Sequence, residues 1–156
     1  VYKRQIFLLV AASNFFGAGF SRFGTPTMIT EFLLAWDLSP MMVLIIILAF
    51  IFLLGWPLEW VPIVLIILPI LIPVLLKLDV NLTWFGILVA VNLQTAWLSP
   101  PVALSAYFLK GVVPEWDLKD IYLGMMQFMV IQLIGLALIF MFPQIALWLP
   151  TYIYGQ

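Results

Sequence analysis

The sequence predicts an all-α polytopic membrane protein in which a re-entrant helical hairpin precedes a transmembrane helix broken by prolines. Of the 156 residues, 66% are hydrophobic and 8% are charged, whereas a soluble domain is about 45–50% apolar and about 25% charged. The apolar residues form several long runs separated by short polar segments. Runs of this kind indicate that the bilayer is the solvent of the protein. Because Gly and Pro interrupt two of the runs, we do not expect every helix to cross the bilayer as one continuous span.

The composition excludes several classes of function. The sequence contains no Cys and no His. Disulfides, thiol nucleophiles, histidine bases and zinc or haem sites with Cys or His ligands are therefore excluded. The net charge of −1 provides no basic patch, so nucleic acid is not an expected partner. An enzyme would have few reactive groups left, and we predict that the protein is not one.

The N-terminal part begins with a short segment, residues 1–5, whose composition differs from that of the rest. We interpret this segment as a sequencing artefact and leave it out of the predicted fold. Residues 6–20 predict a transmembrane helix, although they are short for a span of about 20 residues. Residues 27–36 end at Trp36 and are typical of a short amphipathic helix in the membrane interface.

Residues 40–76 contain two intensely apolar segments joined by a turn with Gly55, Pro57 and Glu59. They form either two full spans with a tight external loop or a re-entrant hairpin whose tip lies at mid-membrane. Each segment reaches only about 22 Å at about 1.5 Å per residue, short of a core of about 30 Å, so length favours the hairpin. Glu59 then begins the second arm, either as an ion-binding acid or as a helix cap at an aqueous cavity.

Residues 83–111 are too long for a simple span and are interrupted by Ser99, Pro100 and Pro101. Neither proline donates a backbone hydrogen bond, so carbonyls of the preceding turn lose their helical donors. In lipid each such carbonyl costs several kcal/mol unless it finds a partner. The break is either a kink buried against neighbouring helices or the site of a bound cation.

Asn92, Thr95 and Ser99 supply side-chain oxygens to the segment around this break. Hydroxyls and freed carbonyls are hard oxygen ligands, and broken helices at mid-membrane hold Na⁺ and substrate in many secondary transporters. We therefore predict an ion- and substrate-binding site at the break, with Thr95, Ser99 and nearby carbonyls as the Na⁺ ligands.

The C-terminal part predicts a final transmembrane helix over residues 121–149, with Trp148 in an aromatic belt, followed by a tail over residues 151–156. Lys110 and Lys119 flank the preceding polar loop and place it on the cytoplasmic side.

Spaced motifs in this order give the chain a resemblance to a known family. They include Leu54-Gly55-x-x-Leu58-Glu59-Trp60, Leu68-Pro69-Ile70-Leu71-Ile72-Pro73, Trp84-Phe85-Gly86-Ile87-Leu88 and Val91-Asn92-Leu93-Gln94-Thr95-x-x-Leu98-Ser99-Pro100-Pro101-Val102. With them the chain resembles the C-terminal part of the large permease subunit of tripartite ATP-independent periplasmic (TRAP) transporters, and it is similar to the mannitol/chloroaromatic-type subgroup.

The resemblance implies an architecture and a site. Residues 6–150 would form the second inverted repeat of an elevator-type transporter more than twice as long as this chain. The hairpin tip and the break would meet at mid-membrane, so that Gly55 and Glu59 join Asn92, Thr95, Ser99, Pro100 and Pro101 around Na⁺ and substrate.

The resemblance also implies a function, which is Na⁺-coupled uptake of an organic acid, a carboxylate, across the bacterial inner membrane. The expected partners are a small membrane subunit, a periplasmic substrate-binding protein and membrane lipid, with no cofactor besides the coupling Na⁺. Another ion-coupled carboxylate transporter of the same superfamily is the alternative. A membrane-embedded enzyme would need catalytic groups that the sequence lacks, and a purely structural subunit would not need a broken helix.

Overall fold

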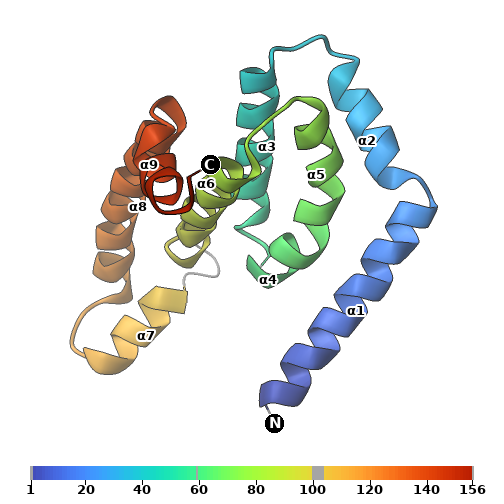
Figure 1. The fold of residues 1–156 in the computed structure, drawn as a ribbon. Helices are drawn as coiled ribbons and strands as arrows, with labels where there is room; N and C mark the ends of the chain where they lie inside the picture. Colours follow the sequence, from blue (N-terminus) through green and yellow to red (C-terminus); the bar gives the residue numbers. More distant parts are fainter. Residues whose placement is uncertain (1, 59, 100–103, 156) are drawn as a thin grey trace. The chain divides into compact units, whose positions relative to one another are not determined.

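The computed structural model describes residues 2–58, 60–99 and 104–155, and within these residues it is all-helical without a strand. The helices in chain order (Figure 1) are α1 (Tyr2–Arg22), α2 (Thr25–Leu34), α3 (Pro40–Leu54), α4 (Trp60–Pro62), the π-helix η1 (Ile63–Ile67), α5 (Leu68–Lys77), α6 (Leu82–Gln94), the 3₁₀-helix η2 (Thr95–Trp97), α7 (Leu104–Val112), α8 (Leu118–Met141) and α9 (Gln144–Tyr154).

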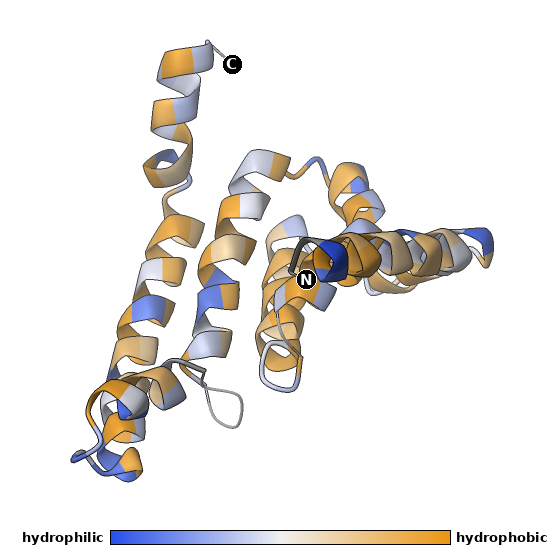
Figure 2. Cartoon of the chain, turned by 90° about the horizontal axis from the view of Figure 1, so that it is seen from below, coloured by the Kyte–Doolittle hydropathy of each residue, from blue (hydrophilic) through white to orange (hydrophobic). Residues whose placement is uncertain are grey.

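Hydrophobic residues occupy most of the length of these helices (Figure 2). Within the described residues, two stretches, Trp60–Lys77 and Leu118–Met141, are each long and apolar enough to cross a bilayer. The predicted fold class, an all-α polytopic membrane protein, is therefore confirmed.

The described residues fall into two compact units. The first comprises Val1–Ile47 and Leu58–Val80, and the second comprises Leu48–Pro57 and Asn81–Gln156. Helix α3 contributes to both units. Every predicted site residue that the structure describes belongs to the second unit.

In the first unit, α1 and α2 are joined by a bend of 62°. Gly24 lies at the bend with φ of 71°, a left-handed conformation that glycine adopts without strain, and Pro26 follows in the first turn of α2. The sequence predicts separate helices over residues 6–20 and 27–36, whereas α1 and α2 together are apolar enough to form one broken span or a re-entrant loop. Helix α1 also includes residues 2–5, which are predicted from their composition to be an artefact.

The second arm of the predicted hairpin over residues 40–76 is helical from α4 through η1 to α5. Pro69 has no N–H, and just before it Leu68 bonds to the carbonyl of Ile63, five residues earlier, in a wider π-helical turn. Such turns accompany prolines inside helices. The arm is thus long enough to cross a bilayer by itself, and the re-entrant form of the hairpin stays a prediction.

In the second unit, α6 begins at a side-chain cap, because Asn81 accepts a hydrogen bond of 3.0 Å from the backbone N–H of Trp84. One face of α6 is buried, and this face consists of Trp84, Phe85, Leu88, Val89, Asn92 and Leu93. Helix α8 buries Ile121, Met125 and Met129 at helical spacing, and α7 packs on α8 through Ala106. Hydrophobic faces of α6, α7 and α8 therefore form the core of this unit.

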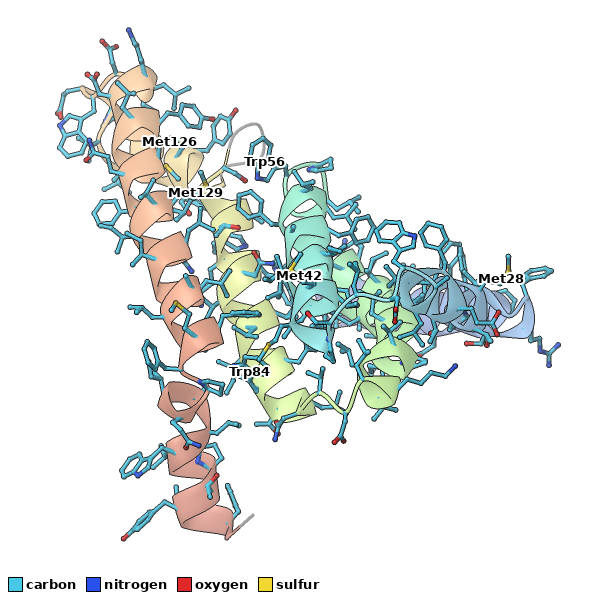
Figure 3. All side chains as sticks on the ribbon, turned by 90° about the horizontal axis from the view of Figure 1, so that it is seen from above. Met28, Met42, Trp56, Trp84, Met126 and Met129 are labelled. Atoms are coloured by element: carbon cyan, nitrogen blue, oxygen red, sulfur yellow. The ribbon has the colours of Figure 1, made fainter. Side chains whose placement is uncertain are left out.

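Helix α8 ends earlier than the sequence predicts. The predicted helix covers residues 121–149, whereas α8 stops at Met141 and a separate helix, α9, follows. Pro143 has no N–H for the carbonyl of Ile139, four residues earlier. The indole Nε1–H of Trp84, a side chain labelled in Figure 3, donates to that carbonyl instead at 3.0 Å. Side-chain donation from α6 thus accommodates the break after α8.

Candidate functional site

The break predicted in residues 83–111 begins before the prolines. Helix α6 ends at Gln94, and the chain tightens into the 3₁₀ turn η2. The carbonyl of Thr95 then accepts backbone hydrogen bonds from both Leu98 at 3.1 Å and Ser99 at 3.0 Å. Regular α-helical hydrogen bonding is therefore lost one turn ahead of Pro100.

Three polar side chains that the sequence singles out are buried around this turn. Asn92 and Thr95 are each 1% exposed and Ser99 is 0% exposed. The hydroxyl of Thr95 donates to the carbonyl of Asn92 at 2.6 Å. The hydroxyl of Ser99 lies 3.4 Å from the carbonyl of Ala96, longer than the usual 2.5–3.0 Å of an O–H···O bond. Both hydroxyl oxygens keep lone pairs that can accept a donor or a cation.

Asn92 connects the break to α3. Its side-chain N–H donates to the carbonyl of Leu48 at 2.8 Å. Its oxygen Oδ1 is buried and has no hydrogen-bond partner within the described part of the chain. A buried acceptor without a partner costs about 1–3 kcal/mol. Such an oxygen is suited to bind a cation or to accept a hydrogen bond from a ligand.

Gly55, the first residue of the turn after α3, is buried against η2. A Cβ atom added to Gly55 would lie 3.3 Å from the Cβ of Ala96 and 3.3 Å from the backbone oxygen of Phe52. Only glycine fits this approach without displacement of a neighbour. The structure therefore places Gly55 beside the same turn that carries Thr95.

Glu59, Pro100 and Pro101 are also predicted site residues, and they lie outside the described residues. Their roles at the hairpin tip and at the break stay predictions. Of the predicted set, the structure thus brings together Gly55, Asn92, Thr95 and Ser99.

Gln132 of α8, which is not among the predicted site residues, contacts the end of α6. Its side-chain Nε2 donates to the carbonyl of Val91 at 3.0 Å and to the side-chain oxygen of Gln94 at 2.6 Å. The signal that would have found it is an amide inside a helix apolar enough to cross a membrane, because such side chains mostly bond to neighbouring helices.

Comparison with known proteins identifies the family. The family described as "Tripartite ATP-independent periplasmic transporter, DctM component" matches residues 2–145. The chain is 29% identical over 96% of its length to the sialic acid TRAP transporter large permease protein SiaM of Vibrio cholerae, of which it covers 35%. It is 31% identical over 82% of its length to the C4-dicarboxylate TRAP transporter large permease protein DctM of Rhodobacter capsulatus, of which it covers 29%.

The sialic acid TRAP transporter permease protein SiaT of Haemophilus influenzae is 27% identical over 92% of the chain, which covers 23% of that relative. The chain therefore spans about a quarter to a third of the length of these relatives. No solved structure matches the chain significantly. The relatives are named as transporter permeases and not as enzymes, which agrees with the prediction that the chain is not an enzyme. The family match confirms the resemblance to the large permease subunit, while the subgroup stays a prediction, and the chain belongs to the DctM component family of tripartite ATP-independent periplasmic transporters.

Proposed function

We propose that this chain is part of a large permease that couples Na⁺ entry to the uptake of an organic acid across the bacterial inner membrane. The observation that carries the proposal is the buried, unpartnered Oδ1 of Asn92 among the described residues. It lies in the same broken helix as two further buried oxygens, the hydroxyls of Thr95 and Ser99.

The chemistry of this oxygen set fits Na⁺. Amide, hydroxyl and backbone carbonyl oxygens are hard, uncharged ligands, which suit a monovalent cation released again during each transport cycle. Helix α6 ends at this set, and the C-terminal end of a helix carries partial negative charge. Unwound backbone and half-helix C-termini coordinate Na⁺ in other secondary transporters. In this proposal Gly55 lets the end of α3 close over the site, with Glu59, Pro100 and Pro101 completing it.

The substrate and partners follow from the family. The relatives reported above are named for sialic acid and C4-dicarboxylates, which are carboxylates, so we propose a carboxylate as substrate. A periplasmic substrate-binding protein would deliver it, and a small membrane subunit would complete the scaffold of the permease. The hairpin and the broken helix would move together as the transport domain of an elevator.

The test is uptake by the complete permease that contains this segment, reconstituted in proteoliposomes with its small subunit and a substrate-loaded binding protein. We expect uptake to require Na⁺ and to stop when choline replaces it. Three single variants, Asn92→Leu, Thr95→Val and Ser99→Ala, should each raise the half-saturating Na⁺ concentration about tenfold, as for the loss of one ligand worth about 1.4 kcal/mol.

Thr83→Val is the matched control, because it removes a hydroxyl from an exposed position of the same helix, α6. Its Na⁺ dependence should equal that of the wild type. Uptake that continues in choline would contradict Na⁺ coupling. An unchanged Na⁺ dependence in all three site variants would remove these side chains from the ion site.

A further inference from the structure

We infer that Gln132, on α8, is a positioning residue that holds the broken end of α6 in its ion-binding form. The inference rests on the proposed Na⁺ site and adds to it a residue from another helix. It starts from the hydrogen bonding of one backbone carbonyl, that of Val91.

The carbonyl of Val91 loses its helical donor at the break. In a continuous α-helix it would accept from the N–H of Thr95, four residues later. Because the chain tightens into η2, the N–H of Thr95 is directed to the carbonyls of Asn92 and Leu93. Val91 needs a donor from elsewhere, since water does not serve this role inside a bilayer.

Gln132 supplies that donor. One N–H of its amide bonds to the Val91 carbonyl at 3.0 Å, and Nε2 also contacts the side-chain oxygen of Gln94 at 2.6 Å. A glutamine amide has two N–H donors, so this pair of contacts uses both and fixes the orientation of the side chain. Gln132 thus caps the C-terminal end of α6 from α8.

The cap lies next to the proposed ion ligands. Val91 and Gln94 bracket Asn92, and Thr95 follows directly. Without the cap, the Val91 carbonyl would compete for the N–H of Thr95 and draw η2 back toward α-helical hydrogen bonding. Asn92, Thr95 and Ser99 would then change their spacing, although within the described residues none of their side chains forms a hydrogen bond with Gln132.

The test compares Gln132→Met with Gln127→Met in the complete reconstituted permease. Methionine matches glutamine in length, favours helices and suits lipid, so the first variant removes the donor with little change in shape. Gln127 is an exposed amide on the same helix, which makes its variant the matched control. Gln132→Asn, whose amide is one methylene shorter, serves as a second variant if Gln132→Met does not insert.

We expect Gln132→Met to raise the half-saturating Na⁺ concentration about tenfold, as for residues that orient metal ligands. The KM for the substrate-loaded binding protein should stay unchanged. Backbone hydrogen exchange over residues 95–99 should become faster in Gln132→Met and remain at the wild-type rate in Gln127→Met.

A normal Na⁺ dependence in Gln132→Met would overturn the positioning role, even if hydrogen exchange becomes faster, because Gln132 would then act on stability alone. An equal loss of Na⁺ affinity in Gln127→Met would overturn it as well. Wild-type uptake without any Na⁺ dependence would instead contradict the proposed function, so the two failures are distinguishable.

Discussion

At the scale of single residues, Gly55 sets how closely the end of α3 approaches the break. A Cβ atom on Gly55 would lie 3.3 Å from the Cβ of Ala96 and 3.3 Å from the backbone oxygen of Phe52. The backbone oxygen cannot rotate away as a side chain would. A methyl group at this position therefore forces the turn to move.

We expect Gly55→Ala to lower the free energy of unfolding of the complete permease by about 1–3 kcal/mol, the usual cost of overpacking. This cost exceeds the gain of about 0.4–1 kcal/mol from a less flexible unfolded chain. Thermal unfolding in detergent measures the effect.

Gly86→Ala is the control for Gly55→Ala, and it should raise the free energy of unfolding where Gly55→Ala lowers it. Gly86 lies inside α6 with no atom within 4 Å of its added Cβ, so alanine should stabilise the helix by about 0.5–1 kcal/mol. Equal changes in the free energy of unfolding for Gly55→Ala and Gly86→Ala would show that Gly55 is not in a tight contact. The double variant Gly55→Ala with Ala96→Gly should recover part of the loss, because it removes one of the two close contacts.

The residue types at the site could be predicted from the sequence because polar groups are rare in apolar runs. Asn92, Thr95 and Ser99 stand out for this reason, and all three are buried. Gln132 has the same signal but no nearby motif, and its partner Val91 is an ordinary apolar residue. The contact depends on the register between two helices, which composition and spacing along one chain do not encode.

At the scale of the helices, α6 and α8 each donate a side-chain hydrogen bond to a backbone carbonyl of the other. Trp84 of α6 donates to the carbonyl of Ile139, which Pro143 deprives of a helical donor, and Gln132 of α8 donates to the carbonyl of Val91. As the α6 residue moves from 84 to 91, its α8 partner moves from 139 to 132, so the helices are antiparallel. Each helix caps the end of the other.

We expect Trp84→Phe to lower the free energy of unfolding by about 0.6–1.5 kcal/mol, the range for one such hydrogen bond. Phenylalanine keeps a ring beside Phe140, which now lies 5.6 Å from the indole centre, and removes only the donor and part of the ring. Thermal unfolding of the complete permease in detergent is the measurement. Trp148→Phe is the control, because this side chain is 63% exposed, and it should leave the free energy of unfolding unchanged. If Trp148→Phe lowers it as much as Trp84→Phe does, the hydrogen bond of Trp84 is not the cause of the loss.

The helices themselves follow from the sequence more closely than their ends do. Apolar runs predict α1, α3, α6 and α8 because an apolar segment in a bilayer must satisfy its own backbone hydrogen bonds, and a helix does so. The sequence does not predict the end of α8 at Met141, because the apolar run continues past Pro143. A proline removes one donor, and whether the helix then stops depends on which side chain replaces that donor, here Trp84 from another helix.

At the scale of the whole molecule, the absence of Cys from these 156 residues lets a single introduced Cys report their membrane topology, once any Cys elsewhere in the complete permease is replaced. We expect Glu115→Cys, in the loop between α7 and α8, to react with a membrane-impermeant maleimide from the cytoplasmic side, since Lys110 and Lys119 flank this loop. Thr83→Cys and Gln144→Cys should react from the opposite side, because we predict that the broken helix and α8 each cross the membrane once.

Leu88→Cys is the control, because Leu88 is 0% exposed and should react only after denaturation. Labelling of Thr83→Cys and Glu115→Cys from the same side would mean that the broken helix does not cross the membrane.

The hydrogen bonds between α6 and α8 also have a consequence for the synthesis of the protein. Helix α6 leaves the ribosome before α8, and at about 5–20 residues per second the Gln132 side chain follows Val91 by several seconds. During that interval the end of α6 has no cap in lipid, so the nascent break must remain in the translocon, in contact with water, or in a temporary continuous helix. In the proposed function, the ion site is then completed only when α8 inserts beside α6.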